Sequence, residues 1–217
     1  NGIWYHPALW NMLEIAKNPF ENVFGSSTEK YYLYSSWLSP FIAYILGIKS
    51  KIYFFIFHLF LATLYLFLTI SLIKKSIKTE NLKKSLIIFL IFPVSMTSFY
   101  WVGYDSLILL LMVISLYKNK NYLITLICSI GIGLQHFEIG LVSIIVVAIS
   151  SIIERIFYVN EKKIKISFVF KITFITGLII GKIILYKIYN DESFVDGRLQ
   201  WISDALLHLF YNFYFKD

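Results

Sequence analysis

The chain has 217 residues, of which 58% are hydrophobic and only 15% are charged, with a formal net charge of +7. Soluble domains carry about 25% charged residues and disordered chains are poor in the Phe, Ile and Leu that dominate here, so both classes are excluded. The basic residues lie in short clusters between apolar runs, which indicates membrane orientation and gives no support for a nucleic-acid partner. We therefore expect an all-α polytopic transmembrane bundle, and the single cysteine, Cys128, excludes a disulfide framework.

Residues 1–50 are predicted to form an external, aromatic-rich segment of amphipathic helices that lie on the membrane. Aromatic side chains suit the headgroup level, and this segment holds Trp4, Tyr5, Trp10, Tyr31, Tyr32, Tyr34 and Trp37. A second interpretation makes residues 33–48 a short crossing, but Pro40 and the neighbouring serines favour a re-entrant or interfacial course. The chain begins at Asn1 without a signal peptide, so we expect a fragment or a processed product.

The first complete crossing is predicted over Ile52–Ile73, which carries no charge. About 20 apolar residues span the roughly 30 Å of hydrocarbon in a bilayer. The loop that follows is rich in lysine, so the positive-inside rule places it in the cytoplasm. Its basic residues are Lys74, Lys75, Lys78, Lys83 and Lys84.

Two long apolar stretches follow, and each is predicted to form a hairpin that crosses the membrane twice. As single helices, Ser85–Tyr117 and Asn121–Ile153 would each be about 50 Å long, and both have basic flanks that belong inside. A last crossing runs outward over Ile166–Tyr189. The chain would then cross about six times, with residues 51–189 as the transmembrane domain and residues 190–217 as an external segment that we expect to be truncated.

The turns of the two hairpins hold the first candidate catalytic residues, Asp105, His136 and Glu138. The arms are short, so these side chains could line a cavity sunk into the outer leaflet, where irregular backbone is tolerated. A buried carboxylate is a candidate for a functional site, and a histidine suits proton transfer. The alternatives are that Asp105 caps a helix that begins at Ser106, and that His136 and Glu138 form an ordinary polar turn. The His-x-Glu spacing supplies too few ligands for a metal site.

Two basic residues are candidates for binding a lipid phosphate, Lys182 in the last crossing and Arg198 beyond it. Lys182 could instead snorkel to the interface, or pair with Asp105 or Glu138, and Arg198 could be a solvated loop charge. His58 is predicted to form a hydrogen bond within the bundle. Gly177 and Gly181 match the small-residue motif for helix packing, which says nothing about activity.

Two stretches resemble the GT-C-type integral membrane glycosyltransferases. NGIWYHPALWNMLEIAKNPFENVF, followed by YSSWLSPFIAYILG, is similar to the first external loop of those enzymes, where an amphipathic segment ends in a K-N-P-F-like turn. GYDSLILLLMVISLYKNKNYLITLICSIGIGLQHFEIGLVSII resembles their pattern of an Asp that opens a short span, a basic loop, and a Gly-rich span that ends in a polar pair. The resemblance covers about residues 1–150.

This resemblance implies an inverting transfer of a sugar from a polyprenyl-phosphate donor to an external lipid or glycan acceptor. A base would deprotonate the acceptor hydroxyl, and His136 with Lys182 or Arg198 would stabilise the departing phosphate. Asp105 and Glu138 would bind acceptor hydroxyls or support the other groups.

In that family the catalytic acidic residue lies in the first external loop, just after the first transmembrane helix. Residues 1–50 contain no Asp. The resemblance therefore implies that the base lies upstream of Asn1, or that Glu14, Glu21 or Glu29 replaces it.

Two other functions stay open. A Wzy/EpsG-like polysaccharide polymerase or ligase also has an external site and a Gly-rich span that ends in His, as GIGLQHFEIG does. A non-enzymatic carrier or lipid flippase would use Asp105 and Lys182 as coupling charges. No cofactor is identified, and a divalent metal ion is left open. The expected partners are membrane lipids, a polyprenyl-phosphate-sugar donor and a glycan or lipid acceptor, in a bacterial plasma (inner) membrane with the site facing outside.

Overall fold

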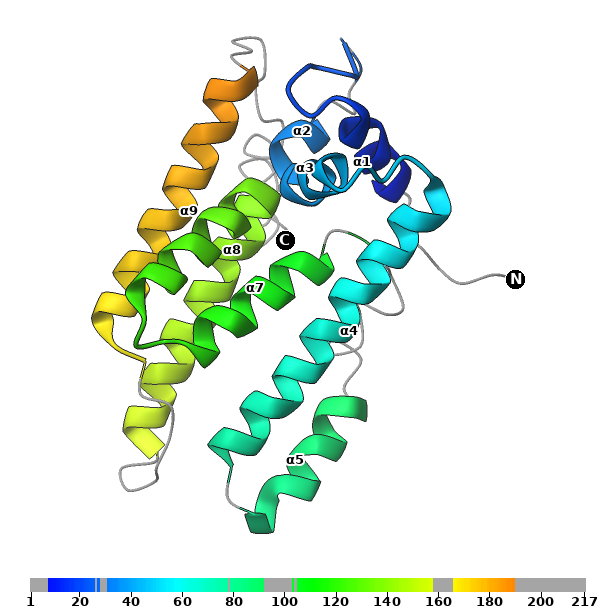
Figure 1. The fold of residues 1–217 in the computed structure, drawn as a ribbon. Coiled ribbons are helices and arrows are strands. Elements are labelled where there is room, and N and C mark those ends of the chain that lie inside the picture. The colour runs from blue at the N-terminus through cyan, green and yellow to red at the C-terminus, as the bar shows by residue number, and fades with distance from the viewer. Residues whose placement is uncertain are drawn as a thin grey trace, which may run out of the picture.

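The computed structural model describes residues 8–25, 27, 31–77, 79–91, 103, 105–157 and 166–189, which form helices joined by turns (Figure 1). In chain order the helices are α1 (Ala8–Lys17), α2 (Tyr31–Ser35), α3 (Leu38–Ile45), α4 (Lys51–Ser76), α5 (Thr79–Ile91), α7 (Asp105–Tyr117), α8 (Tyr122–Phe157) and α9 (Phe168–Tyr189). These ranges contain no strand. The predicted all-α class is therefore confirmed for the described part of the chain.

Three of the described helices are long and apolar enough to cross a membrane, namely α4, the Tyr122–Ile153 part of α8, and α9. The predicted crossings at residues 52–73 and 166–189 coincide with α4 and α9. α7 is also apolar but shorter, about 20 Å long at 1.5 Å per residue. By length and composition these three helices are candidate membrane-spanning helices, and the expected total of about six crossings stays a prediction.

The long helix α8 consists of two helical arms that meet at a break. At the break, His136 has φ −166° and ψ 95°, which is extended backbone. A Cβ placed on Gly140 would lie 2.8 Å from Cγ2 of Ile132, although a continuous helix would separate these residues by about 12 Å along its axis. The second arm therefore folds back along the first (Figure 1). The chain turns where the polar residues of the second hairpin predicted.

The first arm of α8 packs against α9 with almost no space between the two backbones. A Cβ on Gly133 would lie 2.5 Å from the carbonyl oxygen of Leu178, and one on Gly181 would lie 2.5 Å from the carbonyl oxygen of Ile130. Only glycine fits at such a distance from a neighbouring backbone. Gly177 and Gly181 thus lie in a helix–helix contact, as the small-residue motif predicted.

α7 lies between α4 and the α8–α9 pair. Ile108 belongs to an apolar cluster that contains residues of α8 and α9. Leu107 and Leu110 belong to a second cluster with α4. α7 therefore joins α4 to the α8–α9 pair, and the first predicted hairpin turn, at residues 98–106, lies largely outside the described residues.

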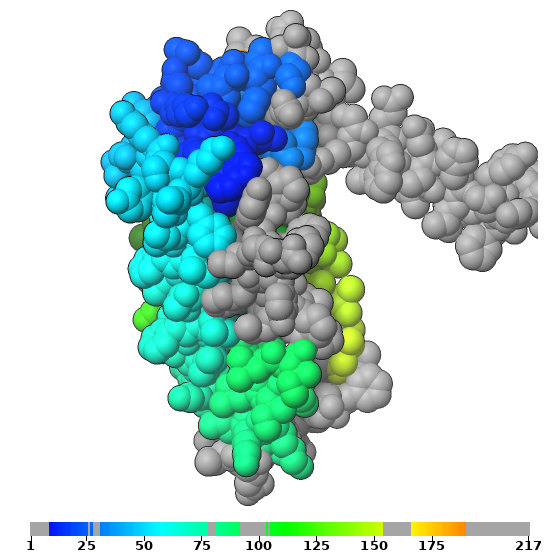
Figure 2. Space-filling model, turned by 90° about the vertical axis from the view of Figure 1, so that its right-hand side faces the viewer, coloured from blue at the N-terminus to red at the C-terminus, as the bar shows by residue number. Residues whose placement is uncertain are grey.

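The first three helices form a cap, residues 8–45, over one end of the bundle (Figure 1). In Figure 2 the blue cap lies directly above the cyan α4. Leu9 and Met12 of α1 are buried against Phe54 of α4. Ile15 shares a cluster with Leu134 of α8 and with residues of α2 and α9. The cap is thus fixed to α4, α8 and α9 through apolar contacts.

Two of the cap's aromatic residues are buried, contrary to the expectation that they lie at the headgroup level. Tyr34 and Trp37 are only 2% and 4% exposed. The ring of Tyr34 lies 5.5 Å from that of Tyr189 in α9, and the ring of Trp37 lies 4.6 Å from that of Phe41. Protein atoms therefore cover these two rings, and the placement of the segment on the membrane stays a prediction. The structure also divides residues 33–48 between two helices too short to cross a membrane, α2 and α3.

Candidate functional site

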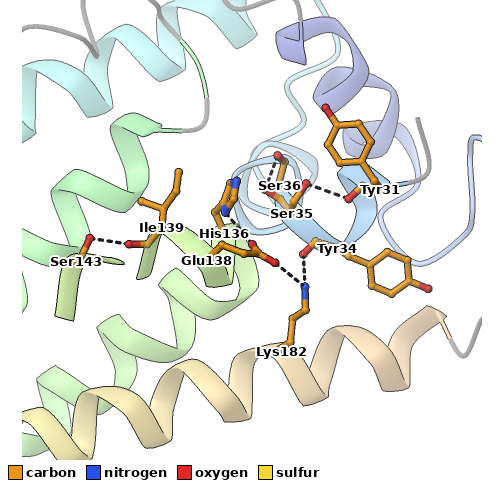
Figure 3. A network of polar contacts seen from close by, with 9 residues as sticks. All are labelled: Tyr31, Tyr34, Ser35, Ser36, His136, Glu138, Ile139, Ser143 and Lys182. Carbon is orange, nitrogen blue, oxygen red and sulfur yellow. Dashed lines mark hydrogen bonds and ion pairs between the residues drawn. The ribbon is translucent and has the colours of Figure 1, made fainter. Parts of the chain in front are cut away.

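Three polar side chains that the sequence singled out meet where α8 breaks, beneath the cap (Figure 3). His136 Nδ1 lies 3.0 Å from Glu138 Oε2, and Lys182 Nζ of α9 lies 3.6 Å from Glu138 Oε1. The side chains of His136 and Lys182 are 8% and 13% exposed, whereas that of Glu138 is 36% exposed. We term these three residues the His–Glu–Lys group. Glu138 is the most exposed of the three.

The break in α8 is what allows His136 and Glu138 to meet. In a regular helix, residues i and i+2 point about 200° apart and do not face one another. The extended backbone at His136 removes this restriction. The contact therefore depends on the interruption of the helix and would be absent from a straight α8.

Lys182 is held by groups from three helices. Its ammonium donates a hydrogen bond to the backbone carbonyl of Tyr34 in the cap, at 3.3 Å. It also lies 5.8 Å from the ring centroid of Phe137 and 5.6 Å from that of Tyr186, within range of a cation–π attraction. Of the two carboxylates expected as partners of Lys182, the structure shows Glu138 beside it.

Direct hydrogen bonds from the cap fix the last turn of α8 before the break. The backbone N–H of Trp37 donates to the carbonyl of Leu134 at 3.3 Å. Gln135 accepts from the backbone N–H of Ser39 at 2.7 Å and donates through Nε2 to the Ser39 hydroxyl at 3.0 Å. Gln135 and Ser39 are both fully buried. The position of His136 is therefore set by the cap as well as by the bundle.

The geometry gives the group two distinct chemical capacities. A carboxylate next to Nδ1 favours the tautomer with the proton on Nδ1, which leaves the lone pair of the neutral ring on Nε2. The ammonium of Lys182 has three donors; one of them binds the carbonyl of Tyr34, and the carboxylate of Glu138 lies 3.6 Å away. The group can thus accept a proton and bind an anionic oxygen at the same place.

The other predicted site residues lie elsewhere or outside the described residues. Asp105 is half-buried and is the first residue of α7, where the helix dipole favours a carboxylate. The helix begins one residue earlier than expected. Arg198 and Glu29 lie outside the described residues. Glu14, a candidate to replace the family's base, pairs with Lys17 on the exposed surface of α1.

His58 lies in α4 and is fully buried. Its Nδ1 is 3.0 Å from the carbonyl oxygen of Phe54, one turn earlier in the same helix. The prediction that His58 forms a hydrogen bond within the bundle is confirmed.

Sequence reasoning missed part of what surrounds the site. Gln135 stood out only as a polar interruption, and Ser39 only as a residue unsuited to a crossing; nothing in their spacing indicated that they meet. A backbone carbonyl such as that of Tyr34 leaves no signal in a sequence at all. The sequence feature that did indicate the site was the presence of isolated polar residues in apolar runs, since such residues need partners when they are buried.

Among the described residues, no three His, Cys, Asp or Glu side chains gather as a set that could hold a metal ion. Comparisons of the chain with protein-family models, curated proteins and solved structures found no match. What the site does is therefore inferred from its own chemistry.

Proposed function

We propose that the protein is a membrane glycosyltransferase that moves a sugar from a lipid-phosphate donor to a lipid or glycan acceptor outside the cytoplasm. The observation that carries the proposal is the contact of His136 and Lys182 with one carboxylate, Glu138, at the break in α8. A proton acceptor and a cation placed side by side are what a displacement reaction at a phosphorylated sugar requires.

The proposed reaction is a single inverting displacement at the sugar carbon attached to the phosphate. His136, oriented by Glu138, takes the proton of the acceptor hydroxyl. The acceptor oxygen then forms a bond to the sugar carbon as the bond from that carbon to the phosphate oxygen breaks. Lys182 stabilises the negative charge that remains on the lipid phosphate, and the proton stays on His136 until it is released to water.

We further propose that the cap end of the molecule faces the outside of a bacterial plasma membrane, within a topology of about six crossings. Lys74 and Lys75 lie in the last turn of α4, whose far end points away from the cap (Figure 1). The ammonium of Lys75 lies 4.6 Å from the ring centroid of Tyr117, the last residue of α7, which Lys118 and Lys120 follow. Short loops rich in lysine stay in the cytoplasm, which supports an outward-facing cap and an outward-facing His–Glu–Lys group.

The experiment that tests this proposal measures sugar transfer from a polyprenyl-phosphate-sugar donor by the protein in membranes. We expect alanine in place of His136 or Glu138 to lower the rate about 100-fold or more, the usual range for removing an acid–base group. Alanine in place of Asp105 tests whether this residue binds the acceptor or only begins α7. Full activity in all three variants would contradict the proposal.

The interrupted helix α8 also favours a second candidate, a non-enzymatic lipid carrier. Carriers often place discontinuous helices and intramembrane charges at their binding sites, and the break at His136 lies next to Lys182. Reconstituted protein would then move a lipid-linked sugar between leaflets without releasing the sugar from its phosphate. Transfer of the sugar to an acceptor excludes this alternative, and movement without transfer supports it.

A further inference from the structure

The corner between α3 and α4 is built from a tight set of local hydrogen bonds. Gly47 adopts φ +69°, and the backbone N–H of Ile48 donates to the carbonyl of Ala43 at 2.9 Å, which is the usual left-handed end of a helix. Ser50 then caps α4 by accepting from the backbone N–H of Tyr53 at 3.2 Å. Hydrogen bonds thus hold both ends of this corner, residues 44–53, against the adjoining helices.

This rigid corner exposes five large apolar side chains. They are 48% to 71% exposed, and they are Tyr44, Ile45, Leu46, Ile52 and Tyr53. Elsewhere in the cap the large apolar residues of α1 turn inward, as Leu9, Met12 and Ile15 do. An apolar cluster of this kind is a site of interaction with a partner or a membrane.

The same corner carries two exposed basic residues, Lys49 and Lys51. The ammonium of Lys51 also lies 5.3 Å from the ring centroid of Trp10, on α1. Apolar side chains with lysines beside them are the arrangement by which proteins enter the headgroup region of a membrane with anionic lipids.

The apolar surface of the corner continues along α4. Ile56, Phe60 and Phe67 are each more than half exposed, and α4 is apolar and long enough to span a bilayer. In Figure 2 the cyan segment that contains the corner forms the outer edge of the molecule at the level where the cap meets α4. A surface that faces lipid along α4 would therefore extend onto the cap without interruption.

We propose that the α3–α4 corner is a membrane anchor for the cap, and that its occupant is the anionic lipid of the leaflet beside it. Leu46 and its apolar neighbours enter the boundary between headgroups and hydrocarbon, while Lys49 and Lys51 bind lipid phosphates. The inference rests on the part of the proposed function that places α4 across the membrane. It fixes the depth of the cap, and hence of the His–Glu–Lys group, relative to the lipid headgroups.

The test uses nitroxide labels on single cysteines in a Cys128→Ala background, with the protein in nanodiscs of phosphatidylcholine and phosphatidylglycerol. Accessibility to oxygen reports apolar surroundings and accessibility to a nickel chelate reports water. We expect a label at Leu46→Cys to be reached more readily by oxygen than by nickel. Phe60→Cys, in the middle of α4, is the control for a lipid-exposed span, and Glu21→Cys, on the exposed surface of the cap, is the control for water.

The role of the lysines is measured as the preference of the protein for spin-labelled phosphatidylglycerol over spin-labelled phosphatidylcholine. Each basic residue near an anionic surface is worth about fivefold in affinity, so the double variant Lys49→Gln/Lys51→Gln should lose most of this preference. Lys17→Gln, an exposed lysine elsewhere on the cap, should retain it.

Three outcomes separate the two proposals. Oxygen access at both Leu46 and Phe60, with loss of lipid preference in the double lysine variant, supports the anchor. Oxygen access at Phe60 with nickel access at Leu46, or an unchanged lipid preference, overturns the anchor and leaves the proposed function standing. Nickel access at Phe60 overturns the membrane placement itself and both proposals with it.

Discussion

Two contact regions of the molecule differ in kind. One is the contact between α8 and α9 inside the bundle, and the other is the interface of the cap with α8 and α9, which we call the seam. Between the first arm of α8 and α9 the backbones touch at Gly133 and Gly181, and the surrounding side chains are apolar. At the seam, apolar contacts are accompanied by hydrogen bonds between residues far apart in the sequence, as between Ser39 and Gln135 or between Tyr34 and Lys182. Close approach of backbones distinguishes the first region, and hydrogen bonds between distant residues distinguish the second.

This difference indicates which of the two regions can accommodate reactive polar side chains. Lipid tails are as apolar as leucine, so helices in a membrane associate through close packing at small residues. A region of that kind tolerates no polar side chain that lacks a partner. The seam provides such partners, and the break in α8 places His136 and Glu138 among them.

The largest effect on stability is expected from filling the close contact in the bundle. Gly181→Leu would force a side chain into the backbone of α8 and should cost about 3 kcal/mol. A decrease in melting temperature would show this, and reaction of the buried Cys128 with a thiol dye can follow the melting. The control is Gly131→Ala, whose Cβ would meet only the tips of two leucine side chains and should cost less than about 1 kcal/mol. Equal losses in the two variants would refute the backbone contact.

A smaller effect is expected from removing the polar pair at the seam. Gln135→Leu leaves the backbone N–H of Ser39 without its acceptor, which costs about 2 kcal/mol for a buried donor. Thr125→Val is the matched control, because Thr125 is also fully buried in the first arm but its hydroxyl donates to the carbonyl of Asn121, one turn away in the same helix. If both variants melt at the same temperature, the seam contributes no specific stability.

The smallest effect is expected where two donors share one acceptor. The carbonyl of Pro19 accepts from Trp37 Nε1 at 2.7 Å and from the Tyr189 hydroxyl at 2.8 Å. Either single variant, Trp37→Phe or Tyr189→Phe, leaves the carbonyl paired. Tyr189→Phe should therefore cost about 0.5–1 kcal/mol, and Trp37→Phe should cost this amount plus that of the volume it removes from a buried site. The double variant should lose more than the sum of the two, because the carbonyl then has neither of these donors. Additive losses would show that the two hydrogen bonds are independent.

The sequence predicted the apolar helices well, because length and lack of charge suffice to identify them. α4 and α9 lie where their composition predicted, and the turn in α8 lies where polar residues interrupt an apolar run. The same isolated polar residues pointed to His136, Glu138 and Lys182 as site candidates, which the structure brings together.

The sequence did not predict which aromatic residues of the cap are buried. The aromatic residues Tyr34 and Trp37 suggested a membrane surface, yet the bundle buries both. A buried aromatic ring and one at the headgroup level look alike in a sequence, because only the tertiary fold decides what covers them. For the same reason nothing in the spacing of Ser39 and Gln135 indicated that they pair.

The most direct test of the account compares sugar transfer by two variants that each neutralise one glutamate. Glu138→Gln keeps the shape of the side chain but removes the charge that orients His136 and pairs with Lys182, whereas Glu14→Gln alters only an exposed pair with Lys17 on the cap. The account predicts that Glu138→Gln lowers the rate of transfer about 100-fold or more, while Glu14→Gln transfers sugar at the wild-type rate. Wild-type transfer by a folded Glu138→Gln variant would contradict the account.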